Sequence, residues 1–342
     1  MYEKPPYTIT EKAADYLAKI VETVTRLEFG TDFRRNIKLH RKNRVRTIYS
    51  SLAIEGNTLS LDEVTAVIEG KVVAGKQAEI KEVKNAYEAY DKIMTFNPYS
   101  IKDFLKAHKL ITNGLVAESG KFRSGDVGVF DGDVAIHVGA RPQFVPGLMD
   151  ELFGWAKESE LHPVLKSAIL HYEIETIHPF SDGNGRIGRL WQTLLLAKWN
   201  AIFEWIPMES VLYENRPQYY QAIEAARKAN DSGAFIEFTL SSLLSIIEIQ
   251  VKNKDKPLLD NEDGTVKFGE SVGEFGEKFG EKQTQKKIIA LMRLNPKISA
   301  KALGEAINLT TRGIEKSISA LKKAGVIERV GSAKGGHWVV KQ

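Results

Sequence analysis

Twelve consecutive residues hold several groups that could together bind and attack a phosphate. The segment is His178-Pro-Phe-Ser-Asp182-Gly-Asn-Gly-Arg186-Ile-Gly-Arg189. The imidazole is a candidate general base, and the aspartate could hold a Mg²⁺ that bridges phosphates. The two central glycines let backbone amides approach a ligand, and they precede a predicted helix whose first turn and dipole favour an anion. The segment therefore predicts a phosphate-binding loop with a base beside it.

Two arginines extend this set of groups. Arg186 and Arg189 are three residues apart, so both can project from one side of the first helical turn toward the anion. Taken singly, a histidine before a proline or a Gly-Asn-Gly turn would have an ordinary structural explanation. No evident structural need explains a base, a carboxylate, an amide nest and two cations within twelve residues. We therefore favour a catalytic, phosphate-binding role for this segment.

Predicted helices surround this loop. Pro163 suits the first turn of a helix over 164–177, and Pro179 ends that helix. Apolar spacing of three and four residues predicts further helices, over 16–27, 78–94, 101–116 (capped by Ser100), 186–199, 217–228 and 234–251. Residues 120–145 differ, because glycines separate the short runs 127–130 and 134–138, which Asp131-Gly132 could join as a β-hairpin.

A second helical signal lies upstream. Helical spacing runs from Asn43 to Ile54, and Gly56 with Asn57 can form a left-handed C-terminal cap. Ser60 and Glu63 have the spacing of a capping box for a new helix that ends near Gly70. This region is predicted to fold as helix, turn, helix.

Residues 178–189 resemble the motif His-x-Phe-x-Asp/Glu-Gly-Asn-Gly-Arg-x-x-Arg of the Fic domain proteins at every defined position. The resemblance implies transfer of AMP from ATP to a Ser, Thr or Tyr hydroxyl of a protein. It assigns the base to His178, Mg²⁺ binding to Asp182 and phosphate binding to both arginines. Gly183, Asn184 and Gly185 would form the anion hole, and Phe180 would anchor the loop. The kinase-like branch of the family has lysine where this chain has Gly185.

Residues 51–56, Ser-Leu-Ala-Ile-Glu-Gly, resemble the inhibitory motif Ser/Thr-x-x-x-Glu-Gly/Asn of the same family. In that motif the glutamate pairs with the second arginine and blocks the γ-phosphate of ATP. Here Ser51 and Glu55 would supply the motif and Arg189 would be the partner. The resemblance implies autoinhibition by a segment of the chain itself, without a separate antitoxin.

Two further features resemble Fic proteins less closely. The predicted hairpin resembles the flap that aligns a target segment by strand addition, and its edge would comprise Ile136, His137 and Val138. Tyr219 and Tyr220 resemble the tyrosine pair of the adenine pocket, although one of them could equally be a core residue. His171 lies on an apolar helical face and is interpreted as structural.

The C-terminal end has a different composition. Residues 283–342 hold twelve Lys or Arg against three Asp or Glu, so the rest of the chain, whose total net charge is +4, is acidic. The pattern of helices over 284–294, 299–307 and 310–324 and short strands over 326–330 and 337–340 resembles a winged helix-turn-helix, with its wing tip at 332–336. Arg312, Lys316 and Lys334 would contact DNA phosphates. Winged helices also mediate protein contacts, but the positive surplus favours DNA.

These signals predict a mainly α fold: a Fic-domain helical bundle with a β-hairpin flap, followed by a winged helix-turn-helix. The expected parts are residues 1–95 with the inhibitory helix at about 43–56, the catalytic core 96–251, a Gly- and Glu-rich linker 252–282 and the module 283–342. The absence of cysteine excludes disulfides and thiolate chemistry. No signal peptide or membrane span is evident, so a cytoplasmic protein with no membrane partner is expected.

The principal hypothesis is an autoinhibited protein adenylyltransferase with a DNA-binding module, using ATP and Mg²⁺ and acting on a protein hydroxyl, its own included. The main alternative is a DNA-binding regulator whose Fic domain senses nucleotide. A further alternative is a Fic enzyme that uses another nucleotide or removes AMP, with Glu55 assisting water. The family often dimerises, but no residue here locates a homodimer interface.

Overall fold

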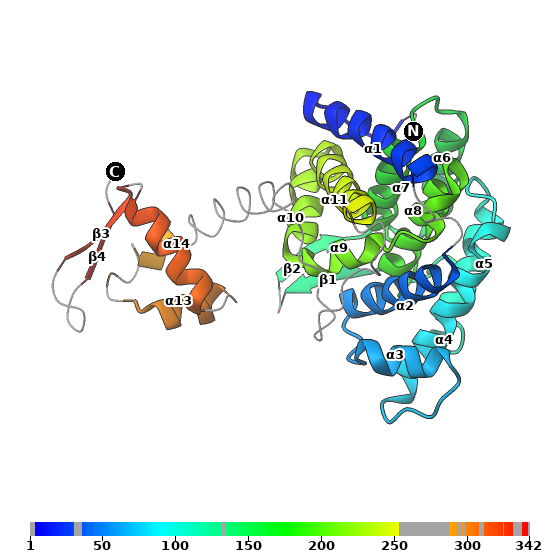
Figure 1. Cartoon of the computed structure of the whole chain (residues 1–342), viewed down its shortest axis with the longest axis horizontal. Coiled ribbons are helices and arrows are strands. Elements are labelled where there is room, and N and C mark those ends of the chain that lie inside the picture. Colours follow the sequence, from blue (N-terminus) through cyan, green and yellow to red (C-terminus); the bar gives the residue numbers. More distant parts are fainter. Residues whose placement is uncertain are drawn as a thin grey trace. The chain divides into compact units, whose positions relative to one another are not determined.

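The computed structural model divides into two compact units, Met1–Gly269 and Glu270–Gln342 (Figure 1). It describes residues 4–30, 36–131 and 134–252 of the first unit, and residues 288–289, 291–292, 296, 298–307, 311–323, 325–330 and 337–340 of the second. Nearly all of the predicted linker 252–282 lies outside the described residues.

The first unit is a helical bundle with one small sheet, which confirms the mainly α prediction. The α-helices are α1 (Glu11–Gly30), α2 (Ile37–Ile54), α3 (Leu61–Ile68), α4 (Gln77–Asp91), α5 (Ile101–Thr112), α6 (Val145–Glu158), α7 (Pro163–Ile177), α8 (Asn184–Trp199), α9 (Met208–Glu214), α10 (Arg216–Ala229) and α11 (Gly233–Lys252). The described residues of this unit also contain the 3₁₀ turns η2 (Ile93–Thr95), η3 (Pro142–Phe144) and η4 (Ala201–Glu204).

The antiparallel pair α7 and α8 forms the centre of this bundle, and the candidate loop 178–183 joins them. α5 and α6 pack on one part of the pair and α11 on another, with α1 lying along α11. An aromatic cluster fills the space beside the loop: Phe104 lies 5.1 Å from Trp191 and 5.4 Å from Phe180 between ring centroids. Phe180 is completely buried, so the loop is anchored in the core, as the sequence resemblance implied.

Helix α2 is buried although it is largely polar, and it packs mainly on α9. Asn43 donates to the carbonyl of Trp205, Ser50 donates to Ser210, and Arg44 forms an ion pair with Glu204 at 3.2 Å. The predicted start at Asn43 is too late, because the helix begins at Ile37 with Asn36 as its N-cap. Of residues 37–42 only His40 is buried and the apolar Ile37 is 80% exposed, so these first turns have no apolar face for the sequence pattern to detect.

The local turn predictions have mixed outcomes. Ser60 and Glu63 form the predicted capping box at the start of α3. The helix predicted over 101–116 instead ends at Thr112, because Gly114 takes a left-handed φ of +67° that interrupts it. The hairpin consists of β1 (Gly128–Asp131) and β2 (Val134–Val138), with an irregular register at Val129/Phe130.

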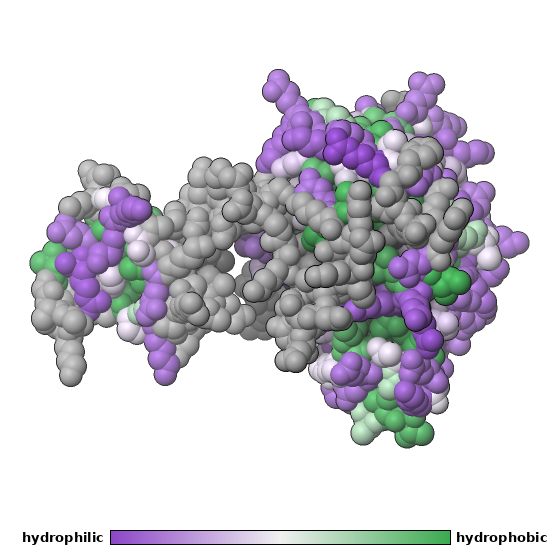
Figure 2. Space-filling model, viewed as in Figure 1, coloured by the Kyte–Doolittle hydropathy of each residue, from purple (hydrophilic) through white to green (hydrophobic). Residues whose placement is uncertain are grey.

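Helix α11 is long and apolar enough to cross a membrane by length and composition alone. About three quarters of its most apolar stretch, 72%, is buried inside the first unit, where α1, α7, α9 and α10 pack on it. Its apolar character is therefore accounted for by the core. On the surface, Figure 2 shows mainly hydrophilic residues with apolar area over α3 and the loop after it, where Val72 is fully exposed.

The second unit contains α13 (Ala300–Ile307), α14 (Thr311–Lys323), β3 (Ile327–Val330) and β4 (His337–Val340). The two strands are antiparallel, with Ile327 opposite Val340. Leu303, Ile314, Leu321 and Trp338 are among the buried residues of its small core. The predicted wing tip 332–336 lies outside the described residues, as does most of the predicted helix 284–294.

Glu173 on α7 gives a test of this packing. Burial raises the pKa of this carboxyl from 4.5 to about 7, and its side chain is 1% exposed with no hydrogen-bond partner for Oε1. The unfolded chain ionises this group above pH 4.5 and the folded chain only near pH 7, so ionisation destabilises the fold increasingly across this window. Glu173→Gln should therefore be more stable than the wild type at pH 8, by roughly 3 kcal/mol.

The difference in free energy of unfolding between this variant and the wild type, from urea titrations at pH 5 and pH 8, measures the effect. We expect the advantage of the variant to be small at pH 5 and to grow toward pH 8. A difference that does not depend on pH would contradict the burial of an ionisable Glu173.

Candidate active site

His178 is the C-cap that follows Ile177, the last residue of α7, and it adopts a left-handed conformation, with φ +54°. Among the described residues only His178 and Asn230 combine a side chain with positive φ, a conformation that costs about 1–2 kcal/mol. Arg123, itself 3% exposed, donates from Nε to the His178 carbonyl at 2.7 Å and from its amino groups to the carbonyls of Gly125 and Ala140. The position of the histidine is thus fixed by a residue that the sequence analysis did not single out.

The imidazole of His178 has its Nδ1 3.4 Å from the carbonyl oxygen of Glu175. A carbonyl only accepts hydrogen bonds, so this long contact favours the tautomer with the proton on Nδ1, in which Nε2 is the nitrogen that can accept a proton. This tautomer is the one that a general base requires. His178 is also half-buried at the edge of the loop.

Asn184 has a structural use that differs from the predicted one. Its side-chain oxygen accepts from the N–H of Phe180 and its side-chain nitrogen donates to the carbonyl of Phe180, both at 2.9 Å. The carboxamide therefore holds the loop closed. Only the backbone N–H of Asn184 remains suited to the predicted anion hole.

Helix α8 begins at Asn184, with Gly183 as its cap at φ +86°. The sequence analysis placed the helix start at Arg186, so Gly185 lies inside the first turn and not before it. The first N–H groups of a helix have no intrahelical acceptor, so this start presents amides and the positive end of the helix dipole at the loop. A side chain at Gly183 would also collide with Thr112.

Asp182 is the predicted Mg²⁺ ligand. Its Oδ1 accepts from the N–H of Gly183 at 2.6 Å and its Oδ2 is 2.9 Å from Nη2 of Arg186, while more than half of the side chain is exposed. Within the described residues no cluster of three or more acidic or histidine side chains could hold a metal alone. One exposed carboxylate beside an anion site nevertheless fits Mg²⁺, which is usually bound by one or two carboxylates together with phosphates and water.

Arg189 is buried and bound to helix α2. Its Nη2 donates to Glu55 Oε1 at 2.7 Å and to the carbonyl of Ser51 at 2.9 Å, and its Nε donates to Ser51 Oγ at 3.2 Å. Burial alone would lower the pKa of Arg189, but the Glu55 carboxylate and other nearby groups raise it above its usual value. The predicted pair of Glu55 and Arg189 is therefore in contact across 134 residues of sequence.

The two motif arginines do not share one partner. Arg186 binds Asp182 and Glu82, whereas Arg189 binds Ser51 and Glu55. Gly185 lies between these groups, and a Cβ there would overlap with Oε1 of Glu55 and lie 2.9 Å from Nη1 of Arg189. A side chain at position 185 would therefore displace the Glu55 carboxylate from its present position beside Arg189.

The tyrosine pair is divided between core and surface. Tyr219 is 1% exposed, and its hydroxyl lies 3.1 Å from Nε2 of His171 and 3.5 Å from Glu175. Tyr220 is 48% exposed. His171 contacts Gln192 at 2.7 Å, which agrees with its interpretation as structural.

Glu175 is an acidic residue of the site that the sequence analysis missed. Burial raises the pKa of its carboxyl, but the bond to His171 and the charges of His171, Arg189 and His178 lower it more, so the group stays ionised. Its position three residues before the motif histidine, on the same helix, was the available signal.

His108 also supports the loop and was not assigned a role from the sequence. Its ring stacks on Phe180 at 3.5 Å between centroids, its Nδ1 accepts from the N–H of Gly120, and its Nε2 lies 2.9 Å from the carbonyl of Asp182. Burial lowers the pKa of His108 to about 4, so the ring is neutral with its proton on Nε2. Its partners lie 12 and 74 residues away, where no local pattern could reveal them.

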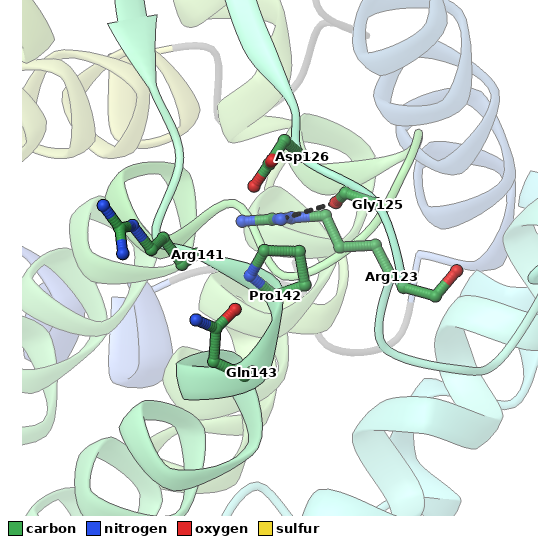
Figure 3. Close-up of a pocket in the computed structure, with 7 residues that line it drawn as sticks. Arg123, Gly125, Asp126, Arg141, Pro142 and Gln143 are labelled. Carbon is green, nitrogen blue, oxygen red and sulfur yellow. Dashed lines mark hydrogen bonds between the residues drawn. The ribbon is translucent and has the colours of Figure 1, made fainter.

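A cavity of about 810 Å³ opens beside the roots of the hairpin. Arg123, Ser124, Gly125 and Asp126 line it from the segment before β1, and Arg141, Pro142 and Gln143 line it from the segment after β2 (Figure 3). Because Arg123 also holds the carbonyl of His178, this cavity adjoins the candidate base. β2 contains Ile136, His137 and Val138, whose side chains are outside the described part of the structure.

Comparison with known proteins identifies the family. Residues 98–196 match the model of the Fic/DOC family. A crystal structure of a Fic family protein from Desulfovibrio desulfuricans G20 is 33% identical, with a TM-score of 0.70 over 99% of this chain and 98% of that one. The chain belongs to the Fic family. The second unit also corresponds to a known type, because residues 281–328 match a winged helix-turn-helix DNA-binding model.

Curated relatives of this Fic protein carry the name protein adenylyltransferase Fic. One from Culex quinquefasciatus is 28% identical over 69% of this chain and 48% of its own length. One from Nematostella vectensis is 33% identical over 56% of this chain and 45% of its own. The chain thus spans about half the length of the curated relatives it matches.

His108→Phe tests the support of the loop. The new ring can keep the stack on Phe180, but the N–H of Gly120 and the carbonyl of Asp182 lose their partner. The free energy of unfolding should fall by about 1 kcal/mol or more, because two hydrogen bonds to partly exposed backbone groups are lost. Urea titration at pH 7.5 measures it, and an unchanged midpoint would mean that Phe180 and Asn184 hold the loop without His108.

Proposed function

We propose that this Fic protein is an autoinhibited adenylyltransferase that transfers AMP from ATP to a hydroxyl of a protein. The observation that carries the proposal is the placement of a basic imidazole nitrogen and a helix N-terminus at the two ends of one rigid loop. The names of the curated relatives support the same activity.

In this reaction the acceptor hydroxyl attacks the α-phosphorus of ATP and its proton passes to Nε2 of His178. A new O–P bond forms, the bond between the α-phosphorus and the bridging oxygen breaks, and pyrophosphate leaves. The first-turn amides of α8 and the two arginines stabilise charge on the phosphates, which is the main contribution that a protein makes to such transfers. Mg²⁺, held by Asp182 and the phosphates, would neutralise further charge on the nucleotide.

The proposed inhibition follows from the position of Glu55. The Glu55 carboxylate is paired with the guanidinium of Arg189, which would otherwise bind the terminal phosphate of ATP. ATP bound in this state lacks that contact, so its α-phosphorus is not aligned for attack, and small misalignments of reacting groups cost large factors in rate. Tyr220 is the better candidate than Tyr219 for contact with adenine, because Tyr219 is almost completely buried.

The target protein is proposed to bind at the hairpin. An extended segment paired with β2 would bring its hydroxyl toward His178. The cavity at the root of the hairpin would then receive a neighbouring target side chain, where Arg141 and Gln143 offer polar groups.

Glu55→Gly tests both activity and inhibition. Transfer of label from α-³²P-ATP with Mg²⁺ to the protein itself or to proteins of a cell lysate should rise roughly 100-fold, the scale of adding one positioned donor. Adding His178→Ala should return transfer to the background. Glu69→Gly is the matched control, because Glu69 caps α3 as Glu55 caps α2, and it should leave transfer unchanged.

Absence of label in all variants would contradict the proposal for ATP. Loss of AMP from a modified protein that requires Glu55 would favour the alternative in which this glutamate assists water. A variant that binds ATP but transfers nothing would favour a nucleotide sensor.

We also propose that the second unit binds DNA. The match to a DNA-binding model and the surplus of basic residues after position 282 support this proposal. Arg312 and Lys316 lie on α14, the third helix of the module, which enters the major groove in winged helix-turn-helix proteins. Lys334, predicted at the wing tip, lies outside the described residues.

The salt dependence of binding to duplex DNA tests this proposal. Affinity measured by fluorescence anisotropy should fall steeply between about 50 and 200 mM salt, because binding releases counterions. Arg312→Ala with Lys316→Ala should weaken binding about tenfold and reduce the salt slope by about two. His178→Ala should bind as the wild type does. Equal binding of the double variant would exclude these two contacts.

A further inference from the structure

Arg186, the first arginine of the motif, is oriented by a residue outside the motif. Its Nη1 lies 2.9 Å from Oε1 of Glu82 on α4, and its Nη2 lies 2.9 Å from Oδ2 of Asp182. The side chain of Arg186 is only 6% exposed. Because a guanidinium is planar, two carboxylates on adjacent amino groups fix the orientation of the whole group.

Glu82 is in turn held by the turn that follows α2. Its Oε2 accepts from Nδ2 of Asn57 at 2.8 Å, and the same nitrogen lies 3.2 Å from the carbonyl of Glu79. Asn57 is bound to the end of α2 through its own N–H, which donates to the carbonyl of Leu52 at 3.1 Å. Glu55 is the C-cap of that helix, so Asn57 and the inhibitory glutamate belong to one turn.

We propose that Glu82 is a positioning residue of the nucleotide site, and that Asn57 couples its position to the inhibitory turn. The hydrogen bonds run from the turn through Asn57, Glu82 and Arg186 to the carboxylate of Asp182. A displacement of the turn that withdraws Glu55 from Arg189 also withdraws Asn57 from Glu82. Both motif arginines therefore respond to one movement. This inference rests on the proposed function, because it concerns how that site binds nucleotide.

Two roles of Glu82, a simple effect of its negative charge and the positioning of Arg186, predict different kinetics. If Glu82 acted only as a negative charge near the phosphates, its neutralisation would lower the KM for ATP, and Gln or Ala would have equal effects. If Glu82 positions Arg186, kcat falls when it is removed. Glutamine then retains more activity than alanine, because its amide oxygen can still accept from Nη1.

The kinetic experiment uses the full chain carrying Glu55→Gly, and compares Glu82→Gln and Glu82→Ala by AMP transfer. We expect kcat to fall about tenfold or more for alanine, as is typical when a supporting partner is removed, and less for glutamine. Glu79→Ala is the matched control, because Glu79 lies on the same helix and binds Lys76 and Thr58. The proposal would be overturned if Glu82→Gln and Glu82→Ala lost kcat equally and had a lowered KM for ATP. It would also be overturned if Glu79→Ala lost as much kcat as Glu82→Ala.

A second measurement does not depend on activity. In the otherwise unaltered protein, nuclear magnetic resonance of ¹⁵N-labelled arginine reports hindered rotation of a guanidinium as separate Nη signals, and Arg186→Lys assigns those of Arg186. We expect separate signals in the wild type and Glu79→Ala, and averaged signals in Glu82→Ala and Asn57→Ala. Unchanged signals in Glu82→Ala would refute positioning, and unchanged signals in Asn57→Ala would refute the coupling. If Glu55→Gly transfers no AMP, the proposed function fails while this measurement still decides the positioning.

Discussion

The buried guanidinium of Arg189 requires an anionic partner, and the arrangement of the site follows from that requirement. Its side chain is 1% exposed, and a buried charge without compensation is strongly destabilising. Glu55 and Ser51 supply the compensation from α2. In the proposed mechanism a phosphate of the nucleotide would replace the carboxylate, and the same arginine would then serve both an inhibited and a nucleotide-bound state.

Helix α2 has both apolar and polar attachments, because Ile48 and Leu52 are buried in the core while polar side chains bond to neighbouring elements. Arg44, Asn43 and Ser50 bond to α9 and its neighbouring turns, and net energies of such bonds are modest compared with burial of apolar area. The catalytic loop is held differently. Phe180 is fixed in the aromatic cluster, and the Asn184 carboxamide closes the backbone around it. The loop is thus anchored by aromatic packing and a carboxamide, whereas α2 combines polar bonds with apolar burial.

The sequence was sufficient to predict what depends on local patterns. The hairpin, the capping box at Ser60, the Fic motif and the α-helices of the first unit other than α6 and α9 all have short-range signals, whereas α6 and α9 were not predicted. The contact of Glu55 with Arg189 was predicted only through resemblance, because no local rule links residues 134 positions apart. His108, Arg123 and Glu82 were missed for the same reason, since each supports the loop from a distant segment. The start of α2 was missed because residues 37–42 are mostly exposed and form no apolar face.

The most direct test of the central claim is a pair of crystal structures, of the wild type and of Glu55→Gly, each with Mg²⁺ and an ATP analogue that cannot be cleaved between the α- and β-phosphates. The account predicts that Arg189 still binds Glu55 in the wild type, and that in the variant it binds oxygens of the γ-phosphate at hydrogen-bonding distance. An Arg189 that contacts the γ-phosphate equally in both structures, with Glu55 still in place, would contradict inhibition by this ion pair.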